Sequence, residues 1–263
     1  METTTPFPSP AGDPGHKIKH TLQKELHKHP KSFEELKEEE IMEWDTSRYD
    51  FAGLIRRIFD IEELDRLHTL IPESTERGFL TVTNDQSTWF HRKFYDSPLL
   101  QEFTSLYQRF VKECIAPTLV DDLIIFQTSP TFRVHLPNNV CVGKKHRDGD
   151  YHHPSGEINY WLPFTAVFDT NGMYVESQPD KGDFHSVDMK YGQVFRFYGN
   201  KCWHYNQPNS TNRTRISVDF RIIPGSVYSQ EELDSIPCSF KARLPFKVGG
   251  YYSSFHKSGA GGA

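Results

Sequence analysis

The sequence predicts a mainly β protein, an antiparallel sandwich or barrel supported by helices nearer the N-terminus. Two observations carry this prediction. After Pro117, short segments rich in β-branched and aromatic residues follow one another, separated by turn sequences such as PNN, DTNG and QPNSTN, with no helical segment between them. Before that point, apolar residues recur at steps of three and four, which is the period of an amphipathic helix.

The composition sets limits on the class of protein. The 263 residues are 36% hydrophobic and 14% aromatic, an ordinary globular mixture that can build a core. No apolar run approaches the roughly 20 residues of a membrane helix, so we expect no membrane partner. A net charge of −5 argues against nucleic acid as the main partner. Four widely spaced cysteines and the absence of an apolar signal segment favour a reduced, cytoplasmic protein.

We divide the chain by these changes in composition. Residues 1–15, rich in Pro, Thr and Gly, are predicted to be a disordered leader. Residues 16–114 are predicted to be a helical buttress with flanking elements. Residues 115–250 are predicted to be the β core, and residues 251–263 a tail.

Three helical segments are expected in the N-terminal part. The Lys-, His- and Glu-rich run 16–40 is typical of a solvated helix face, broken before Pro30, and a partner-binding arm is the alternative. The segments 51–71 and 97–115 each carry an apolar stripe. Ser97 and Pro98 match the N-cap and the first helical position of the last one.

The predicted strands of the core are 122–127, 131–136, 140–146, 157–168, 173–178, 184–189, 192–199, 201–206 and 214–223. The last of them alternates strictly. Its polar residues are Arg215, Ser217, Asp219 and Arg221, and the residues between them are apolar. Because strand side chains alternate, these four polar residues should share one face.

A possible metal centre begins at His146 and Asp148, which are two positions apart. In an extended segment both side chains leave on one face. A third ligand must come from elsewhere, and His204, 58 residues later, is the candidate. Two imidazoles and one carboxylate form the facial triad of non-haem Fe(II) oxygenases, which leaves other positions on the ion open.

Other assignments remain possible at this point. A His-x-Asp pair arises easily by chance in a chain with 13 histidines. Asp150 could replace Asp148, and His152 or His153 could join the ion. His204 by itself would more often be a buried, hydrogen-bonded histidine.

The polar face of the last strand offers an anion clamp. Arg215 follows His204 by 11 residues, and a guanidinium is a planar fork suited to a carboxylate. Ser217, on the same face, can donate a further hydrogen bond. A keto diacid would use both features, with its keto-acid end on iron and its distal carboxylate on Arg215. The alternative is that this polar face of the strand is simply exposed to solvent.

These features resemble the iron- and 2-oxoglutarate-dependent dioxygenase superfamily, whose motif is HxD…H followed by RxS. More narrowly, PTFRVHLPNN, HRDGDYHHPSGEINYWLPFT and HYNQPNSTNRTRISVDFRIIP are similar to the StrG-type group of streptomycin biosynthesis. The likeness covers about residues 120–225. It implies a distorted double-stranded β-helix, a jelly-roll or cupin-like barrel, with iron at one open end. It also implies iron ligation by His146, Asp148 and His204, and 2-oxoglutarate binding by Arg215 and Ser217.

Four further residues are candidates for the same site. Asn159 and Trp161 share a face of the strand after the HxD pair. Asn159 could donate to the cosubstrate or to the ligand carboxylate, and Trp161 could form a pocket wall, or both could simply pack in the core. Arg133 could meet an acidic group of the substrate, or have a surface or ion-paired role. His153 could line the substrate entrance.

The resemblance implies an Fe(II)- and 2-oxoglutarate-dependent dioxygenase that consumes O₂ and releases succinate and CO₂. The expected reaction is hydroxylation of an unactivated C–H bond in a small polar metabolite such as an amino-acid-like compound. Oxidative cyclisation or desaturation, hydroxylation of a protein or peptide, and a noncatalytic β-barrel binding module are the alternatives. Halogenation is disfavoured, because Asp148 occupies the position that chloride would need.

Overall fold

The computed structural model describes residues 16–71, 86–141, 144–236 and 245–257. The predicted leader 1–15 lies outside these residues. The strands are β1 (Lys19–Thr21), β2 (Glu40–Glu43), β3 (Leu123–Gln127), β4 (Thr131–His135), β5 (Ile158–Pro163), β6 (Met173–Val175), β7 (His185–Ser186), β8 (Gln193–Phe197), β9 (His204–Asn206), β10 (Arg215–Pro224) and β11 (Tyr252–His256).

Short helices precede and connect the strands. The α-helices are α1 (Phe33–Leu36), α2 (Phe51–Phe59), α4 (Trp89–Tyr95), α5 (Leu100–Phe110) and α6 (Gln230–Ser235). A π-helical turn, η3 (Val111–Ile115), extends α5. The 3-10 turns are η1 (Gln23–Glu25), η2 (Leu64–Leu70), η4 (Ala116–Thr118), η5 (Asp148–Tyr151), η6 (Asp169–Asn171) and η7 (Gly225–Val227). In the part of the chain described here, no helix is long and apolar enough to cross a membrane.

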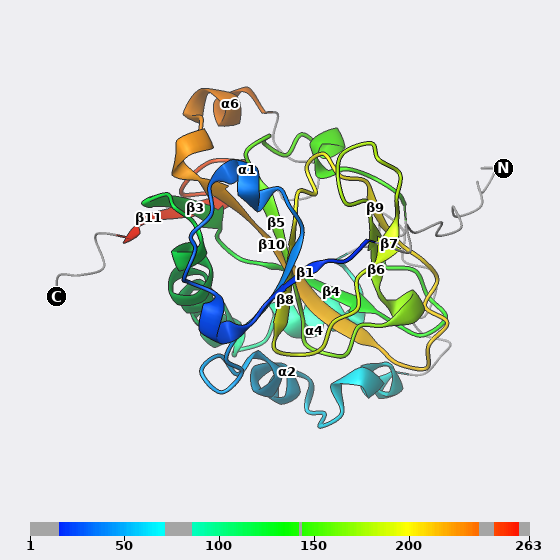
Figure 1. Ribbon diagram of the computed structural model, residues 1–263. Helices are drawn as coiled ribbons and strands as arrows, with labels where there is room; N and C mark the ends of the chain where they lie inside the picture. Colours follow the sequence, from blue (N-terminus) through cyan, green and yellow to red (C-terminus); the bar gives the residue numbers. More distant parts are fainter. Residues whose placement is uncertain (1–15, 72–85, 142–143, 237–244, 258–263) are drawn as a thin grey trace.

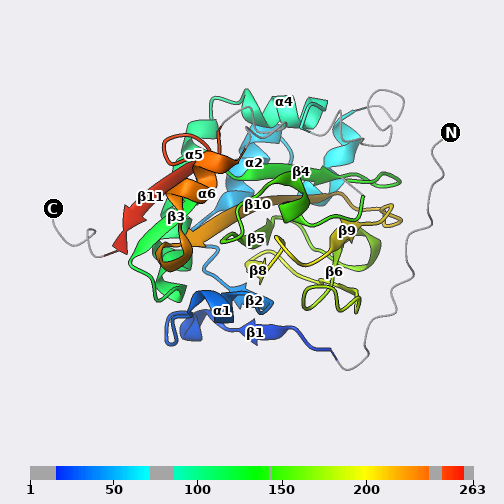
Figure 2. The same ribbon diagram turned by 90° about the horizontal axis from the view of Figure 1, so that it is seen from above.

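Two sheets form the β domain (Figures 1 and 2). The large sheet has the order β1-β2-β8-β5-β10-β3-β11, with β4 also paired to β10, and the small sheet has the order β7-β6-β9. Isolated pairings, His146 with His204 and Val167 with Met189, accompany these ladders. The fold is therefore the predicted double-stranded β-helix, in a distorted form whose described strands do not close into a continuous barrel.

Strand β10 lies at the centre of the large sheet and sets its two faces. Arg221 is opposite Asn159 of β5, and Ser217 is opposite Arg133 of β4. Since directly opposed residues share a face, the polar residues of β10 meet the polar residues of its neighbours. The intervening apolar residues face the other way, as the alternation predicts.

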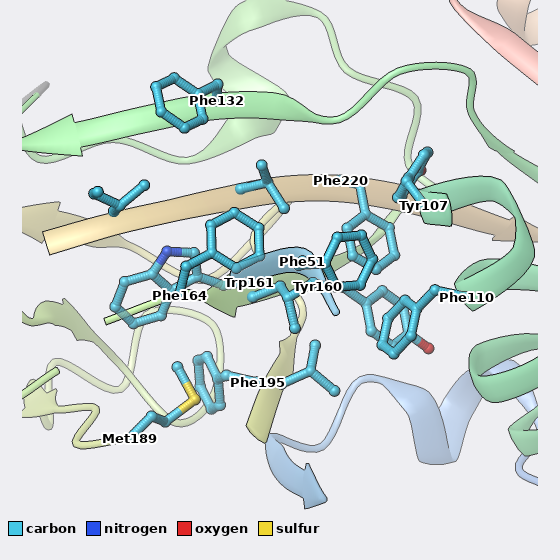
Figure 3. Close-up of a cluster of buried hydrophobic side chains, with 14 of the residues drawn as sticks. Phe51, Tyr107, Phe110, Phe132, Tyr160, Trp161, Phe164, Met189, Phe195 and Phe220 are labelled. Carbon is cyan, nitrogen blue, oxygen red and sulfur yellow. The ribbon is translucent and has the colours of Figure 1, made fainter. Parts of the chain in front are cut away.

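The apolar face of the large sheet packs against the N-terminal helices. Tyr160 of β5 stacks on Phe220 of β10 with ring centres 5.3 Å apart, and Tyr107 of α5 meets Phe220 edge-on at 5.2 Å. Phe51 of α2 and Phe110 of α5 extend this cluster (Figure 3). Burying each such ring contributes about 1.5–3 kcal/mol, so the helices fix the sheet from behind and leave its polar face to the site.

The predicted helix 51–71 is only partly correct. Helix α2 begins at an N-cap, Asp50, whose carboxylate accepts a hydrogen bond from the Gly53 amide at 2.9 Å. It ends at Asp60, which adopts the left-handed conformation with φ 55°. The chain then continues as the 3-10 turn η2, so the apolar stripe spans two separate elements.

The predicted helix 97–115 corresponds to α5 and η3. The helix begins at Leu100, later than expected from the Ser97-Pro98 pair. Ser97 still provides hydrogen-bond acceptors for backbone N–H groups at the start of the helix. Its Oγ accepts from the Leu99 amide at 3.2 Å, and its carbonyl accepts from the Leu100 amide at 3.0 Å.

The prediction of a solvated helix over 16–40 is wrong. This segment holds β1, η1 and α1 and leads into β2, and β1 pairs in parallel with β2. Glu40 of β2 is fully buried, with Oε2 at 2.7 Å from Arg196 and 2.8 Å from Lys31. Burial acts to raise the pKa of Glu40, but these cations hold it below its ordinary value. A buried ion pair thus lets a polar segment join the sheet.

Two further expectations about strands differ from the structure. The predicted tail 251–263 contains β11, which pairs with β3, so the sheet extends past residue 250. The predicted strand 140–146 forms no ladder in its described residues, and only His146 is bridged. Residues 142–143 lie outside the described part.

Candidate metal centre

The three predicted metal ligands come together at one end of the two sheets. His146 and His204 exchange two backbone hydrogen bonds of 3.0 Å, which aligns their side chains, and Asp148, two residues after His146, begins η5. The Nε2 atoms of His146 and His204 lie 3.7 and 3.6 Å from Oδ1 of Asp148. The three atoms all lie within 4.8 Å of one another, close enough to hold a single ion.

Backbone carbonyls orient both imidazoles. Nδ1 of His146 lies 2.8 Å from the Lys144 carbonyl oxygen, and Nδ1 of His204 lies 3.0 Å from that of Cys202. A carbonyl only accepts, so each Nδ1 carries the hydrogen and each Nε2 presents a lone pair. Burial and the neighbouring His204 lower the pKa of His146 to about 4. The imidazole is then neutral at pH 7, as metal ligation requires.

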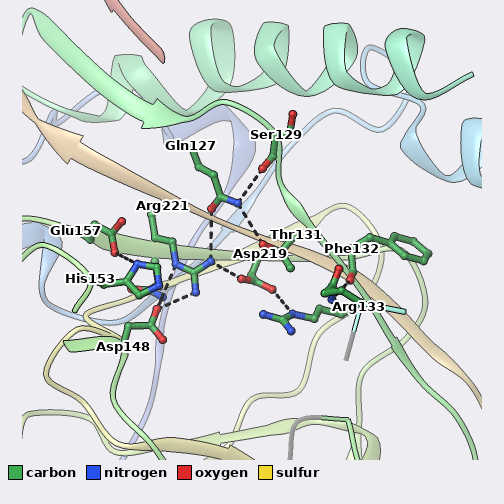
Figure 4. A network of polar contacts seen from close by, with 12 residues as sticks. Gln127, Ser129, Thr131, Phe132, Arg133, Asp148, His153, Glu157, Asp219 and Arg221 are labelled. Atoms are coloured by element: carbon green, nitrogen blue, oxygen red, sulfur yellow. Dashed lines mark hydrogen bonds and ion pairs between the residues drawn. The ribbon is translucent and has the colours of Figure 1, made fainter. Parts of the chain in front are cut away.

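The Asp148 carboxylate is held through one oxygen only. Its Oδ2 accepts from Nδ2 of Asn159 at 2.7 Å. The same oxygen accepts from Nε and Nη2 of Arg221 at 3.2 and 2.8 Å (Figure 4). Burial acts to raise the pKa of Asp148, but the Arg221 guanidinium and the nearby histidines hold it well below its ordinary value. The group is thus a carboxylate with Oδ1 directed at the two imidazoles.

This donor set fits ferrous iron. Two neutral imidazole nitrogens and one carboxylate oxygen on one side of an ion suit non-haem Fe(II) and leave further positions open. The alternative ligands have other partners. Asp150 pairs with Nη2 of Arg147 at 3.1 Å, and Nδ1 of His153 lies 2.8 Å from Oε2 of Glu157. His152 is exposed and forms the left-handed residue that ends η5.

Arg215 lines the cavity that the triad also lines, and Ser217 lies two residues further along the same face of β10. Arg215 is 2% exposed, donates from Nη1 to Oδ1 of Asn206 at 3.0 Å, and lies over the Trp161 ring at 5.0 Å. Within the described residues, Arg215 has no carboxylate at ion-pair distance, and neither its Nε nor the buried Ser217 Oγ has a hydrogen-bond partner. Burial lowers the pKa of Arg215. An incoming carboxylate would satisfy these atoms.

The cavity joins the metal-facing atoms to this guanidinium. Its wall includes Trp161, Met173, Phe197 and Asn206 as well as the triad and Arg215. Trp161 of β5 therefore lines this cavity. Tyr160, on the opposite face, is fully buried in the core.

An ionic chain connects the cavity wall to Asp148. Nε of Arg133 donates to Oδ1 of Asp219 at 2.7 Å, and Oδ2 of Asp219 accepts from Nη1 of Arg221 at 2.6 Å (Figure 4). Arg221 in turn binds Asp148. Arg133 lines the cavity but is ion-paired, which was the alternative to direct substrate contact.

Arg221 and Asn206 are two residues of the site that were not among the candidates predicted from the sequence. The alternation of β10 already placed Arg221 on the same face as Arg215. Its partner could not be read from that pattern, because the contact with Asp148 depends on how η5 lies against β5 and β10. Asn206 carried a weaker signal, being two residues after His204 and therefore on the same face of β9.

The fold thus brings an HxD pair and a distant histidine together beside a buried arginine on a later strand, and two imidazoles with one carboxylate form the facial triad of non-haem Fe(II) oxygenases. No family model matches the chain. The chain is 34% identical over 213 residues to the streptomycin biosynthesis protein StrG of Streptomyces griseus, which covers 81% of this chain and 96% of StrG. The chain belongs to the StrG family.

The solved structures that match the chain include two proteins of nogalamycin biosynthesis, both described as non-heme and alpha-ketoglutarate dependent. The carbocyclase SnoK is 13% identical, with a TM-score of 0.46 over 76% of this chain and 83% of SnoK. The epimerase SnoN is 12% identical, with a TM-score of 0.46 over 77% and 82%. CytC3 with Fe(II) and alpha-ketoglutarate is 15% identical, with a TM-score of 0.42 over 66% and 69%.

Proposed function

We propose that this protein is an Fe(II)- and 2-oxoglutarate-dependent dioxygenase that hydroxylates an unactivated C–H bond of a small polar metabolite, with succinate and CO₂ as co-products. One observation carries the proposal. The ligand atoms of His146, Asp148 and His204 face the same cavity as the Arg215 guanidinium. This guanidinium has no anionic partner among the described residues.

Each residue has a defined task in this proposal. His146, Asp148 and His204 hold the iron, and Arg215 with Ser217 holds the distal carboxylate of 2-oxoglutarate. Bound iron would supply the redox chemistry of the reaction: one oxygen atom of O₂ would enter the substrate C–H bond, and the other would enter the succinate that 2-oxoglutarate forms as it loses CO₂. The protein supplies the binding, the orientation and the exclusion of water around these groups.

Asn159 acts on the ligand carboxylate in this scheme. The sequence left two tasks open for it, a contact with the cosubstrate or one with Asp148. Its Nδ2 donates to Oδ2 of Asp148 at 2.7 Å, which supports the second. With Arg221 on the same oxygen, Asn159 keeps Oδ1 directed at the iron.

A small metabolite is favoured as the substrate. The relative StrG is, by its name, a streptomycin biosynthesis protein. The cavity wall combines apolar side chains, Trp161 and Phe197, with polar ones such as Arg133 and Asn206, a combination typical of small-molecule sites. His153 remains a candidate for the entrance, although its Nδ1 is engaged by Glu157. We also propose a cytoplasmic location, supported by the free thiols of Cys114 and Cys202.

The first experiment tests the metal and cosubstrate sites. Anaerobic protein with Fe(II) and 2-oxoglutarate should develop a weak visible charge-transfer band. His146→Ala should lose the band, while the matched control His152→Ala, which changes an exposed neighbouring histidine, should keep it. A wild-type protein that binds neither iron nor 2-oxoglutarate would favour the noncatalytic binding module.

The second experiment tests the substrate class. Succinate release should be stimulated by members of a library of polar metabolites and not by peptides. Stimulation by peptides alone would identify a peptide hydroxylase. The mass of the product then separates the reaction types, because hydroxylation adds one oxygen atom whereas cyclisation or desaturation removes two hydrogen atoms.

A further inference from the structure

A second group of imidazole and carboxylate side chains lies outside the triad. His16 precedes β1, Glu39 precedes β2, and His185 lies in β7, so three separate segments contribute. One ligand atom from each lies within 4.8 Å of the others. In Figure 1 the start of β1, in dark blue, points toward the end of the small sheet where β7 lies. The group therefore connects the segments that lead into β1 and β2 of the large sheet with β7 of the small sheet.

The two histidines engage opposite oxygens of one carboxylate. Nε2 of His185 lies 3.0 Å from Oε2 of Glu39, and Nε2 of His16 contacts Oε1. The two imidazole rings are 4.5 Å apart. Only 7% of the Glu39 side chain is exposed, against 19% of His16 and 13% of His185. The three side chains thus face one another under partial cover, with the histidines open to solvent on one side.

This carboxylate has no permanent cation beside it. Among the described residues, the ion-pair partners of Glu39 are these two imidazoles, and no lysine or arginine is among them. Nδ1 of His185 lies 3.3 Å from the Asp183 carbonyl oxygen and so carries the hydrogen. The Nε2 of a neutral His185 would then direct a lone pair at a carboxylate oxygen, which is repulsive unless a cation lies between them.

Either a proton or a metal ion can be that cation, and the donor set favours a metal. Two histidines and one glutamate are a common three-ligand set for zinc that leaves a fourth position to water. Zinc–ligand bonds of about 2.0–2.2 Å place tetrahedral ligand atoms about 3.3–3.6 Å apart, so the 3.0 Å between Nε2 of His185 and Oε2 of Glu39 would open by a few tenths of an ångström around the ion. We infer that His16, Glu39 and His185 form a second metal site, which takes Zn²⁺.

The second site lies close to the triad, because His185 and His204 lie in one row across the small sheet. Val175 of β6 is the register partner of His185 on one side and of His204 on the other. With strands about 4.8 Å apart, the backbones of His185 and His204 are separated by about 10 Å in one row. Zinc at the second site would tie β7 to the segments that enter β1 and β2, and so would brace the small sheet that carries His204.

The experiment measures zinc binding to the metal-free full-length chain by competition with a chromophoric chelator. The double variant His146→Ala/His204→Ala removes the triad and should retain one tight Zn²⁺ per chain. Adding His16→Ala should weaken that Zn²⁺ at least about 100-fold, because a direct ligand is lost. The matched control His20→Ala, on the exposed side of β1, should leave the affinity unchanged.

Thermal unfolding gives a second measurement that does not depend on activity. In the double-variant background, Zn²⁺ should raise the Tm, and Glu39→Gln, which keeps the side-chain shape, should abolish the rise. The inference is overturned when the double variant binds no Zn²⁺, or when His16→Ala and Glu39→Gln both leave its binding and the Tm rise unchanged. Iron and 2-oxoglutarate take no part in either measurement, so the result is independent of the proposed function.

Discussion

Arg221 should control the iron affinity of the site without touching the iron. The informative change is Arg221→Lys, because lysine keeps the positive charge and loses the planar fork. Replacement by a neutral residue would also remove a charge that opposes cation binding, and that gain would conceal the loss of orientation. Lysine therefore isolates the geometric contribution.

The expected magnitude follows from the contacts of Arg221. It donates to Oδ2 of Asp148 from Nε at 3.2 Å and Nη2 at 2.8 Å, and from Nη1 to Asp219 at 2.6 Å. A lysine Nζ can replace only part of this set, and each hydrogen bond to a charged group contributes about 1.5–3 kcal/mol. Losing a partner that orients a metal ligand typically weakens metal binding about 10–100-fold, or about 1.4–2.7 kcal/mol.

The assay is an anaerobic Fe(II) titration at pH 7, combined with thermal unfolding to confirm that the variant is folded. The matched control is Arg133→Lys, which changes a second arginine bound to Asp219 but leaves Asp148 untouched. We expect weaker Fe(II) binding for Arg221→Lys and a wild-type value for the control. A folded Arg221→Lys protein with wild-type Fe(II) affinity would refute the idea that Arg221 orients Asp148.

Three other predictions follow from buried polar groups. Arg215→Lys should raise the KM for 2-oxoglutarate about 10–100-fold with a smaller effect on kcat, measured by succinate formation, since a point charge replaces a fork; an unchanged KM would place the clamp elsewhere. Ser217→Ala should leave the free energy of unfolding within about 0.5 kcal/mol of wild type, because its Oγ has no partner in the described residues, while raising the same KM about five- to tenfold; a large loss of stability would reveal a structural role instead. Burial, with a contribution from Arg215, lowers the pKa of His135 to about 3. As the pH falls below about 6.5, this histidine therefore binds a proton in the unfolded chain but not in the folded protein. Denaturant unfolding should then show stability falling with pH down to about 3, and His135→Asn should flatten this slope by up to about 1.4 kcal/mol per pH unit, whereas the exposed control His20→Asn should not.

Strand periodicity made much of the site predictable. The alternation of β10 correctly placed Arg215 and Ser217 on one face and the core residues on the other. The same rule placed Asn159 and Trp161 together, and the register of β5 with β10 agrees. These predictions succeed because a period of two depends only on local backbone geometry.

Features that depend on distant partners were not predictable in this way. The segment 16–40 is polar, and it joins the sheet because Arg196, far along the chain, neutralises the buried Glu40. The expected helix over 51–71 ends at Asp60, a non-glycine residue in a left-handed conformation, which gives no clear signal in the sequence. The contact between Arg221 and Asp148 likewise requires the assembled fold.

The way Asp148 is held also sets how many bonds an ion can form to the protein. Because Oδ2 is hydrogen-bonded to Asn159 and Arg221, the Asp148 carboxylate can offer an ion only Oδ1. The triad then supplies three ligand atoms. An octahedral ion would keep half of its coordination sphere for molecules that arrive from solution. The hydrogen bonds from Arg221 and Asn159 therefore keep Asp148 monodentate, and this determines how many coordination positions stay open for reactants.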